Sequence, residues 1–296
     1  MKKIDIHCHV AAFPQYQNPD NPYNNLSAEG FIEEHNKLDV DFGVILPIVS
    51  PECSSGTGSN FMAKLVADQF PEHFTWFCNL DPRGGKNSST TDFSRYLNHY
   101  KKLGAKGVGE LTASLYADDP MMDNLFRHCA ECDMPVLIHI APQPSGAYGI
   151  VDDLGLPRIE KMLKKHPGLK LIGHSMCFWS EISADNTNET RNKYPKGKVK
   201  EGRLAELMRE YGNLYCDLSA GSGANAMMRD PEYAAGFMAE FSDRIYYGSD
   251  ICYAGQKFQY EFDEFLTGMV SSKMLSRDDY EKIIRKNAER LLDVKE

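Results

Sequence analysis

Eight short runs of β-branched and aromatic residues recur along this 296-residue chain, and each is followed by a segment of helical period. The runs are 3–9, 42–48, 74–80, 105–111, 135–140, 169–174, 213–218 and 244–250. The helical segments are 28–40, 60–70, 92–103, 120–132, 156–166, 201–211, 231–241 and 258–270, and a further one covers 277–294. Eight near-continuous apolar strands alternating with eight helices predict a (β/α)8 (TIM) barrel with an additional C-terminal helix, as one domain over residues 1–296. A doubly wound open sheet is the alternative, but such a sheet does not require eight strand–helix units.

The connections between these elements differ in length. Links from helix to strand are short, whereas links from strand to helix are long, and barrel enzymes build their sites from the latter. The longest polar stretch, Trp179–Lys200, is expected to be a lid or a partly disordered loop. The small-residue stretch Ser219–Ala224 follows the seventh strand and lacks a phosphate-binding lysine, so a flexible turn is expected there.

Ionisable residues stand at the ends of several of the apolar strands. They are His7 and His9 on the first strand, Glu110 on the fourth, His139 on the fifth, His174 on the sixth and Asp250 after the eighth. A single histidine of this kind is usually a hydrogen-bonded core residue. Six such residues at corresponding strand ends all point toward one mouth of the barrel, and neutral imidazole with carboxylate is a donor set that zinc and similar divalent ions accept.

Composition limits the classes of partner. The chain has 42% hydrophobic and 25% charged residues, as a globular protein with a full core does, and its net charge of −9 opposes a large surface for nucleic acid or anionic membrane. No apolar run is long enough for a membrane span, and the N-terminus lacks the pattern of a signal peptide, so a cytoplasmic location is expected. The eight cysteines are scattered, and the pair Cys129-x-x-Cys132 has no second pair to complete a zinc site.

The chain resembles the amidohydrolase superfamily, and most closely its amidohydrolase-2 group of metal-dependent barrel hydrolases and decarboxylases. The resemblance spans nearly the whole sequence and is carried by the segments 4–9, 171–175, 247–250 and 284–292, together with His139. It implies that His7, His9, His139 and Asp250 are metal ligands. It further implies that His174 is catalytic, or is a ligand where two metals bind.

The fourth strand departs from some branches of this superfamily, which carry a carboxylated lysine between two metals. Lys106 lies too early in its strand for that role, and Glu110 occupies the strand end instead. Glu110 is therefore expected to ligate the metal, and the alternative is that it orients a neighbouring histidine.

The expected cofactor is one or two divalent ions, most simply Zn²⁺, which lower the pKa of bound water from ~15.7 to about 7. Asp250 would accept the proton of that water, and His174 would polarise the substrate carbonyl. These parts predict hydrolysis of an amide, ester or lactone bond in a small cyclic or carboxylated substrate. Non-oxidative decarboxylation of an aromatic or unsaturated acid, a metal-dependent nuclease, and a non-catalytic metal- or ligand-binding barrel are the alternatives, and a homo-oligomer is compatible with each.

Two groups of loop residues are candidates for substrate contacts. Basic residues that could receive a carboxylate are Arg83, Arg191, Lys193, Lys196, Lys198 and Lys200. Aromatic residues expected to ring the mouth and pack against a cyclic ligand are Phe13, Tyr16, Tyr23, Tyr148, Phe178, Trp179 and Tyr253.

Overall fold

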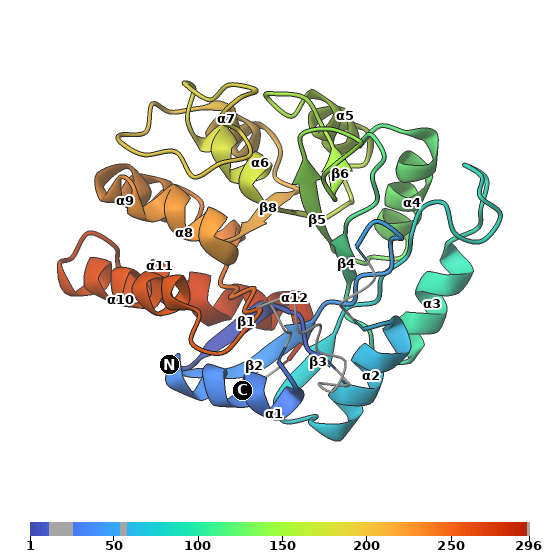
Figure 1. The fold of residues 1–296 in the computed structure, drawn as a ribbon, viewed down its shortest axis with the longest axis horizontal. Coiled ribbons are helices and arrows are strands. Elements are labelled where there is room, and N and C mark those ends of the chain that lie inside the picture. Colours follow the sequence, from blue (N-terminus) through green and yellow to red (C-terminus); the bar gives the residue numbers. More distant parts are fainter. Residues whose placement is uncertain (12–25, 54–57, 295–296) are drawn as a thin grey trace.

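The computed structural model describes residues 1–11, 26–53 and 58–294. Within these residues, eight parallel strands form the barrel wall: β1 (Lys3–Cys8), β2 (Val40–Ile45), β3 (Phe74–Trp76), β4 (Val108–Leu111), β5 (Val136–Ala141), β7 (Leu171–His174), β8 (Leu214–Asp217) and β9 (Ile245–Tyr246). One ladder runs β1–β2–β3 and the other β4–β5–β7–β8–β9. Bridges between Cys78 and Val108 and between Cys8 and Ile251 join the ladders and close the wall. The predicted (β/α)8 barrel is confirmed, and Figure 1 shows helices surrounding the strands.

The helices that follow the strands correspond to the predicted segments. They are α1 (Ala28–Lys37), α2 (Asn60–Gln69), α3 (Ser94–Lys102), α4 (Pro120–Glu131), α5 (Pro157–Lys165), α7 (Arg203–Glu210), α9 (Pro231–Glu240) and α10 (Lys257–Ser271). Ser27 caps α1 by accepting a hydrogen bond from the Gly30 amide. No helix in the described ranges combines the length and apolarity that crossing a lipid bilayer requires.

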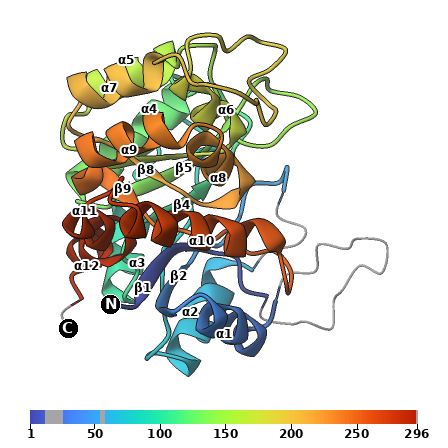
Figure 2. The same cartoon turned by 90° about the vertical axis from the view of Figure 1, so that its left-hand side faces the viewer.

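The final predicted helix is divided into three consecutive pieces. It comprises α11 (Arg277–Glu281), a π-helical turn (Lys282–Lys286) and α12 (Asn287–Leu292). Ala288 and Leu292 of α12 join the apolar cluster inside the barrel, with Ile4, Phe77 and Ile172 from the strands. The Arg285 guanidinium donates to the Lys2 carbonyl, just before β1 begins, and the start of β1 and the end of α12 lie on the same side of the molecule (Figure 2). The last helix therefore covers the end of the barrel where the strands begin, and the opposite end is the mouth.

Three short elements lie in segments that the pattern left as loops. They are β6 (Ile150–Val151), α6 (Met176–Trp179) and α8 (Ala220–Met228), and 3₁₀ turns cover Ser180–Ile182 and Ser242–Arg244. The expectation of a flexible turn at Ser219–Ala224 is wrong because α8 begins there. Gly223 packs so closely on the end of β8 that a Cβ would lie 2.5 Å from the Leu218 carbonyl carbon. This glycine therefore allows α8 to pack against the end of the strand.

The Trp179–Lys200 segment is buried at its start and at Arg191, and most of its other residues are exposed. A bridge between Ser183 and Glu201 closes it at its base. Within it, the Arg191 side chain is buried and donates a hydrogen bond from Nη1 to the Asp152 carbonyl at 3.0 Å. This segment therefore contributes a buried cation to the packing, which its polar composition did not predict.

The first strand contains an irregularity that sets the direction of its side chains. Ile4 and Ile6 face the barrel interior, whereas Cys8 belongs to the outer layer between strands and helices, so the simple alternation along β1 is interrupted. The pairing of β1 with β2 shifts register between Asp5 and Cys8. At this point the His7 amide donates to the Asp5 carboxylate at 2.8 Å. Asp5 faces outward, toward α1, by the ordinary alternation, and the irregularity after it lets His7 face the mouth instead of the outer layer.

Candidate metal centre

The C-terminal ends of the strands bring the predicted site residues together. On β1, Nε2 of His7 lies 3.1 Å from Nε2 of His9, which follows the strand directly. The Glu110 carboxylate on β4 approaches these two nitrogens to 3.7 and 3.3 Å. Asp250, after β9, approaches them to 3.9 and 3.6 Å. Four side chains from three strands thus surround one point.

Two further histidines face the same carboxylates. Nε2 of His174, at the end of β7, lies 3.8 Å from Glu110 and 3.9 Å from Asp250. On β5, Nδ1 of His139 lies 2.7 Å from Glu110 Oε1. Potential ligand atoms form two groups that share His7, one with Glu110 and His174 and the other with His9 and Asp250. The structure places His139 beside Glu110 and outside both groups.

Asp217, at the end of β8, is a member of this cluster that the sequence did not single out. Its carboxylate accepts hydrogen bonds from Nδ1 of His7 at 2.7 Å and from Nδ1 of His174 at 2.9 Å. The Ser219 hydroxyl donates to the same carboxylate at 2.8 Å. Asp217 therefore fixes the orientation of two imidazoles at once. The criterion that selected the other site residues, an ionisable residue at the end of an apolar strand, applies to Asp217 as well.

These hydrogen bonds determine which imidazole nitrogens carry a lone pair. Nδ1 of His7 faces the Asp217 carboxylate, and Nδ1 of His9 faces the Leu46 carbonyl at 3.0 Å. Both partners are acceptors only, so each Nδ1 carries the proton and each Nε2 of a neutral ring presents a lone pair. Two lone pairs opposed at 3.1 Å repel each other unless a proton or a cation lies between them.

The charge around this point is strongly negative. Burial alone disfavours a charged imidazole, but the Asp217 and Asp250 carboxylates outweigh it and raise the pKa of His7 well above its usual value. Burial opposes protonation of His174 as well, yet Asp217 leaves its pKa raised. The Glu110 carboxyl is fully buried, and His139 and the other histidines nevertheless hold its pKa well below the usual value. The cluster therefore attracts positive charge to its centre.

The residues fit a divalent ion. Two nitrogens bound to one ion at ~2.1 Å and roughly 90–110° apart would be separated by about 3.0–3.4 Å. The observed separation between the His7 and His9 nitrogens is 3.1 Å. An ion there would replace the protons that the carboxylates otherwise favour on the imidazoles.

A third group of potential ligands, away from the mouth, does not fit a metal. Asp5, Cys8 and His35 lie close together behind β1, and all three are buried. The Asp5 oxygens already accept four hydrogen bonds, from the amides of His7 and Ser249, the Ser249 hydroxyl and the His35 ring. Burial raises the pKa of the Cys8 thiol well above its usual value and so disfavours the thiolate that would bind a metal.

Three of the six predicted basic residues, Arg83, Arg191 and Lys198, contact other groups of the protein. Arg83 forms ion pairs with Asp81 and Glu52, and Lys198 forms them with Asp230 and Glu232. Arg191 is buried, as described above. These three residues were candidates for a substrate carboxylate, and the hydrogen bonds of each are directed to other groups of the chain.

The predicted aromatic ring is only partly present. Phe13, Tyr16 and Tyr23 lie outside the described residues. Tyr148 is 46% exposed, and its ring packs on His139 with centroids 4.5 Å apart. The placement of Phe178 and Trp179 at the mouth is wrong because both are buried.

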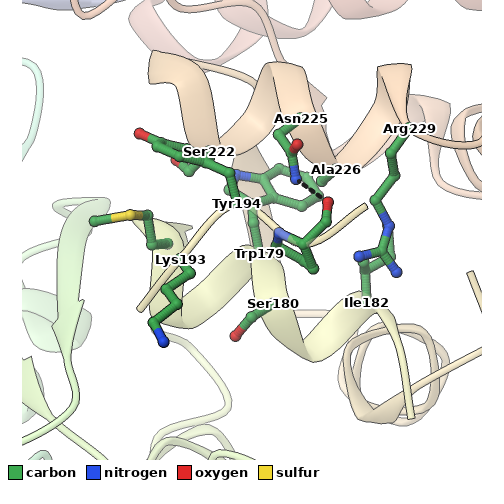
Figure 3. A pocket seen from close by; sticks show the side chains of 11 residues that line it. Trp179, Ser180, Ile182, Lys193, Tyr194, Ser222, Asn225, Ala226 and Arg229 are labelled. Carbon is green, nitrogen blue, oxygen red and sulfur yellow. Dashed lines mark hydrogen bonds between the residues drawn. The ribbon is translucent and has the colours of Figure 1, made fainter. Parts of the chain in front are cut away.

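Trp179 lies behind the site. Its Nε1 donates to the Asp217 carbonyl at 3.0 Å, and its ring lines a narrow cavity of about 10 Å³ between α6 and α8. In Figure 3 this cavity is bounded by Tyr194, Ser222 and Arg229 as well, and Asn225 donates to a carbonyl at its edge. Trp179 therefore buttresses the backbone of Asp217 and is not available to a ligand at the mouth.

Comparison with known proteins identifies the family. The model of the amidohydrolase family matches residues 4–294. No curated protein sequence matches the chain. Several solved structures share its fold: an uncharacterised TIM-barrel protein from Bordetella bronchiseptica is 18% identical, with a TM-score of 0.67 and 99% of each chain covered.

Two other solved structures of this fold are described as enzymes. A probable 2-pyrone-4,6-dicarboxylic acid hydrolase from Acinetobacter baumannii, with citric acid bound, is 14% identical, with a TM-score of 0.61 and coverage of 99% and 100%. A dihydroxybenzoic acid decarboxylase from Polaromonas, with manganese and the inhibitor 2-nitroresorcinol bound, is 18% identical, with a TM-score of 0.60 and coverage of 99% and 97%. At these identities the likeness shows the fold.

Proposed function

The chain belongs to the amidohydrolase family, and from this membership we propose that it is a metal-dependent hydrolase that cleaves an amide, ester or lactone bond in a small cyclic or carboxylated substrate. The observation that carries the proposal is the 3.1 Å approach of two imidazole Nε2 atoms whose rings are both held through Nδ1. The proposed ligands are His7, His9, Glu110, His139 and Asp250, with His174 added if two ions bind. Nitrogen and carboxylate donors suit Zn²⁺, which is the proposed ion.

A divalent ion bound there supplies Lewis acidity, which polarises a carbonyl and makes water in its shell easier to deprotonate. Asp250 is the proposed base. Its side chain is 19% exposed, more than that of Glu110 at 3%, so a water in the mouth can reach it. Asp250 accepts the proton of the attacking water and passes it to the leaving group as the scissile bond breaks.

His174 is proposed to stabilise the developing oxyanion. Asp217 occupies its Nδ1, which leaves Nε2 directed toward Glu110 and Asp250 at the centre of the mouth. Asp217 also favours the protonated ring, whose Nε2–H donates a hydrogen bond to the carbonyl oxygen as it gains negative charge. The buried carboxylate thus orients the proton donor without contacting substrate.

Metal content and turnover test the proposal separately. Protein purified without chelator is expected to contain at least one divalent ion per chain by elemental analysis, and chelation should remove both the ion and hydrolysis of an active member of a lactone, ester and amide panel. Protein that neither retains Zn²⁺ nor takes it up stoichiometrically after purification would refute the assignment.

Decarboxylation of an aromatic or unsaturated acid is the second candidate. It is favoured by the fold shared with the Polaromonas decarboxylase, which binds manganese and a resorcinol-type inhibitor. In that reaction the site would bind a substrate hydroxyl and protonate the carbon that loses carbon dioxide. Release of carbon dioxide from dihydroxybenzoates, with no hydrolysis of the ester and lactone panel, would replace the hydrolase assignment with this one.

A further inference from the structure

Asp250 has an unusual backbone conformation for a residue with a side chain. Its φ is 52°, in the left-handed region, which Asp adopts more readily than most residues with a Cβ but which is still less favourable than the extended region. The residue is anchored on the first strand, because its amide donates to the His7 carbonyl at 3.0 Å. In this conformation the carboxylate lies 3.6 Å from Nε2 of His9. Such strain persists only where surrounding contacts over-determine it.

The contacts that hold this conformation converge on the Asp5 carboxylate. Asp5 is fully buried, and its Oδ1 accepts the amide of Ser249, the residue before Asp250, at 2.9 Å. Its Oδ2 accepts the Ser249 hydroxyl and Nε2 of His35 at 3.1 Å. The Ser249 hydroxyl also receives the Ile251 amide at 3.4 Å. Both neighbours of Asp250 are therefore tied to one carboxylate.

The same carboxylate orients the other side of the site. Oδ1 of Asp5 also accepts the His7 amide, at the point where β1 changes register and turns His7 toward the mouth. Asp5 itself faces α1, where His35 packs between Phe31 and Phe74 with centroid distances of 4.9 and 6.0 Å. One buried carboxylate thus joins an outer helix, the first strand and the turn that carries Asp250.

We propose that Asp5 is a positioning residue that, through Ser249, holds Asp250 in its left-handed conformation and so keeps the Asp250 carboxylate directed at His7 and His9. The inference rests on the proposed function, in which Asp250 is a metal ligand and base. Without the Ser249 contacts, the turn relaxes toward the extended region and carries the Asp250 carboxylate away from the imidazoles. Asp5 does not contact the side chain of any proposed ligand. Its effect on the position of Asp250 is therefore transmitted through the backbone.

Binding of Co²⁺ alone tests this inference without reference to turnover. Ser249→Ala removes the hydroxyl between Asp5 and the Ile251 amide and leaves every proposed ligand in place. Because residues that orient metal ligands typically contribute 10–100-fold to affinity, Co²⁺ is expected to bind about 10–100-fold more weakly, with an altered visible absorption spectrum. The spectrum reports the coordination geometry of the ion, which a loss of stability elsewhere does not change.

Asn287→Ala is the matched control. Asn287 is 2% exposed and donates two hydrogen bonds, to the Ser242 and Ile245 carbonyls. It therefore stabilises the start of β9, the strand that precedes Asp250. This variant is expected to lose stability and to keep the wild-type Co²⁺ affinity and spectrum. If Ser249→Ala and Asn287→Ala change Co²⁺ binding equally, the positioning role is overturned.

Asp5→Asn provides a conservative second variant. The asparagine oxygen can accept the amides of His7 and Ser249, and its NH₂ can donate to the Ser249 hydroxyl and to Nε2 of His35. The ring proton of His35 then lies on Nδ1, which has no hydrogen-bond partner in the described structure. Asp5→Asn is expected to stay closer to wild type in Co²⁺ affinity than Ser249→Ala, and the reverse order would overturn the inference. Wild-type protein that binds no Co²⁺ refutes the proposed function itself, whereas wild-type binding unchanged by Ser249→Ala refutes only the role of Asp5.

Discussion

Asp217→Asn tests the dual role of the carboxylate behind the site. Asp217 accepts Nδ1–H from His7 at 2.7 Å and from His174 at 2.9 Å, one on each oxygen. Asparagine offers one acceptor oxygen and one donor NH₂ in the same volume. The NH₂ then faces an Nδ1, which must give up its proton to Nε2, and that imidazole loses the lone pair directed at the mouth.

The expected cost follows from the loss of one correctly protonated imidazole. Changes in groups that orient a metal-binding histidine cost about 10–100-fold in affinity, or ~1.4–2.7 kcal/mol. Competition between the apo-protein and a chromophoric chelator for Zn²⁺ at neutral pH measures the change. Asp152→Asn is the control: this buried carboxylate accepts the Arg158 and Ile159 amides at the start of α5, so the variant should retain wild-type Zn²⁺ affinity. Wild-type affinity in Asp217→Asn would refute the orientation argument.

Three further predictions concern acid, base and packing. The carboxylates raise the pKa of His7 and His174 above the usual 6.5, so protons already compete with the metal at pH values above 6.5. Zn²⁺ affinity measured by calorimetry should therefore fall steadily as the pH is lowered through 6.5, and an affinity independent of pH would contradict this. Asp250→Asn should reduce turnover by about 10²–10⁴-fold with an unchanged circular dichroism spectrum, and full activity would exclude it as the base. Gly173→Ala should destabilise the fold by at least ~1–3 kcal/mol in urea unfolding, because its Cβ would lie 2.0 Å from the Phe178 ring, and an unchanged midpoint would show that the ring can move aside.

The barrel was predictable because its signal is repeated. Each strand is rich in apolar residues and each helix has its own period, so errors at single boundaries do not change the strand order. The short elements were not predictable in this way. Helix α8 contains glycines that propensity disfavours, and it forms because Gly223 allows close packing on the end of β8. Tertiary contact outweighs propensity there.

The site was only partly predictable, for two physical reasons. Position at a strand end identified His7 and the other residues that the mouth brings together, but their roles as ligands stay predictions. Asp217 ends its strand as His174 does, yet only the fold reveals that its carboxylate lies behind the imidazoles. The placement of Trp179 failed because an aromatic residue after a strand can turn back into the packing, as its hydrogen bond to the Asp217 carbonyl shows. The direction in which a loop side chain points depends on tertiary contacts, so it cannot be predicted from the sequence of the loop alone.

The closure of β1 against the last strand has a consequence for biosynthesis. His7 is synthesised before its partner Asp217, which lies 210 positions later in the chain, and Asp250 follows later still. A nascent chain on the ribosome therefore carries the two proposed imidazole ligands of the first strand long before Asp250 exists. A cation that needs the proposed ligand Asp250 is held by all the proposed ligands only after Asp250 has been translated, so products that terminate before it cannot bind the ion in this way.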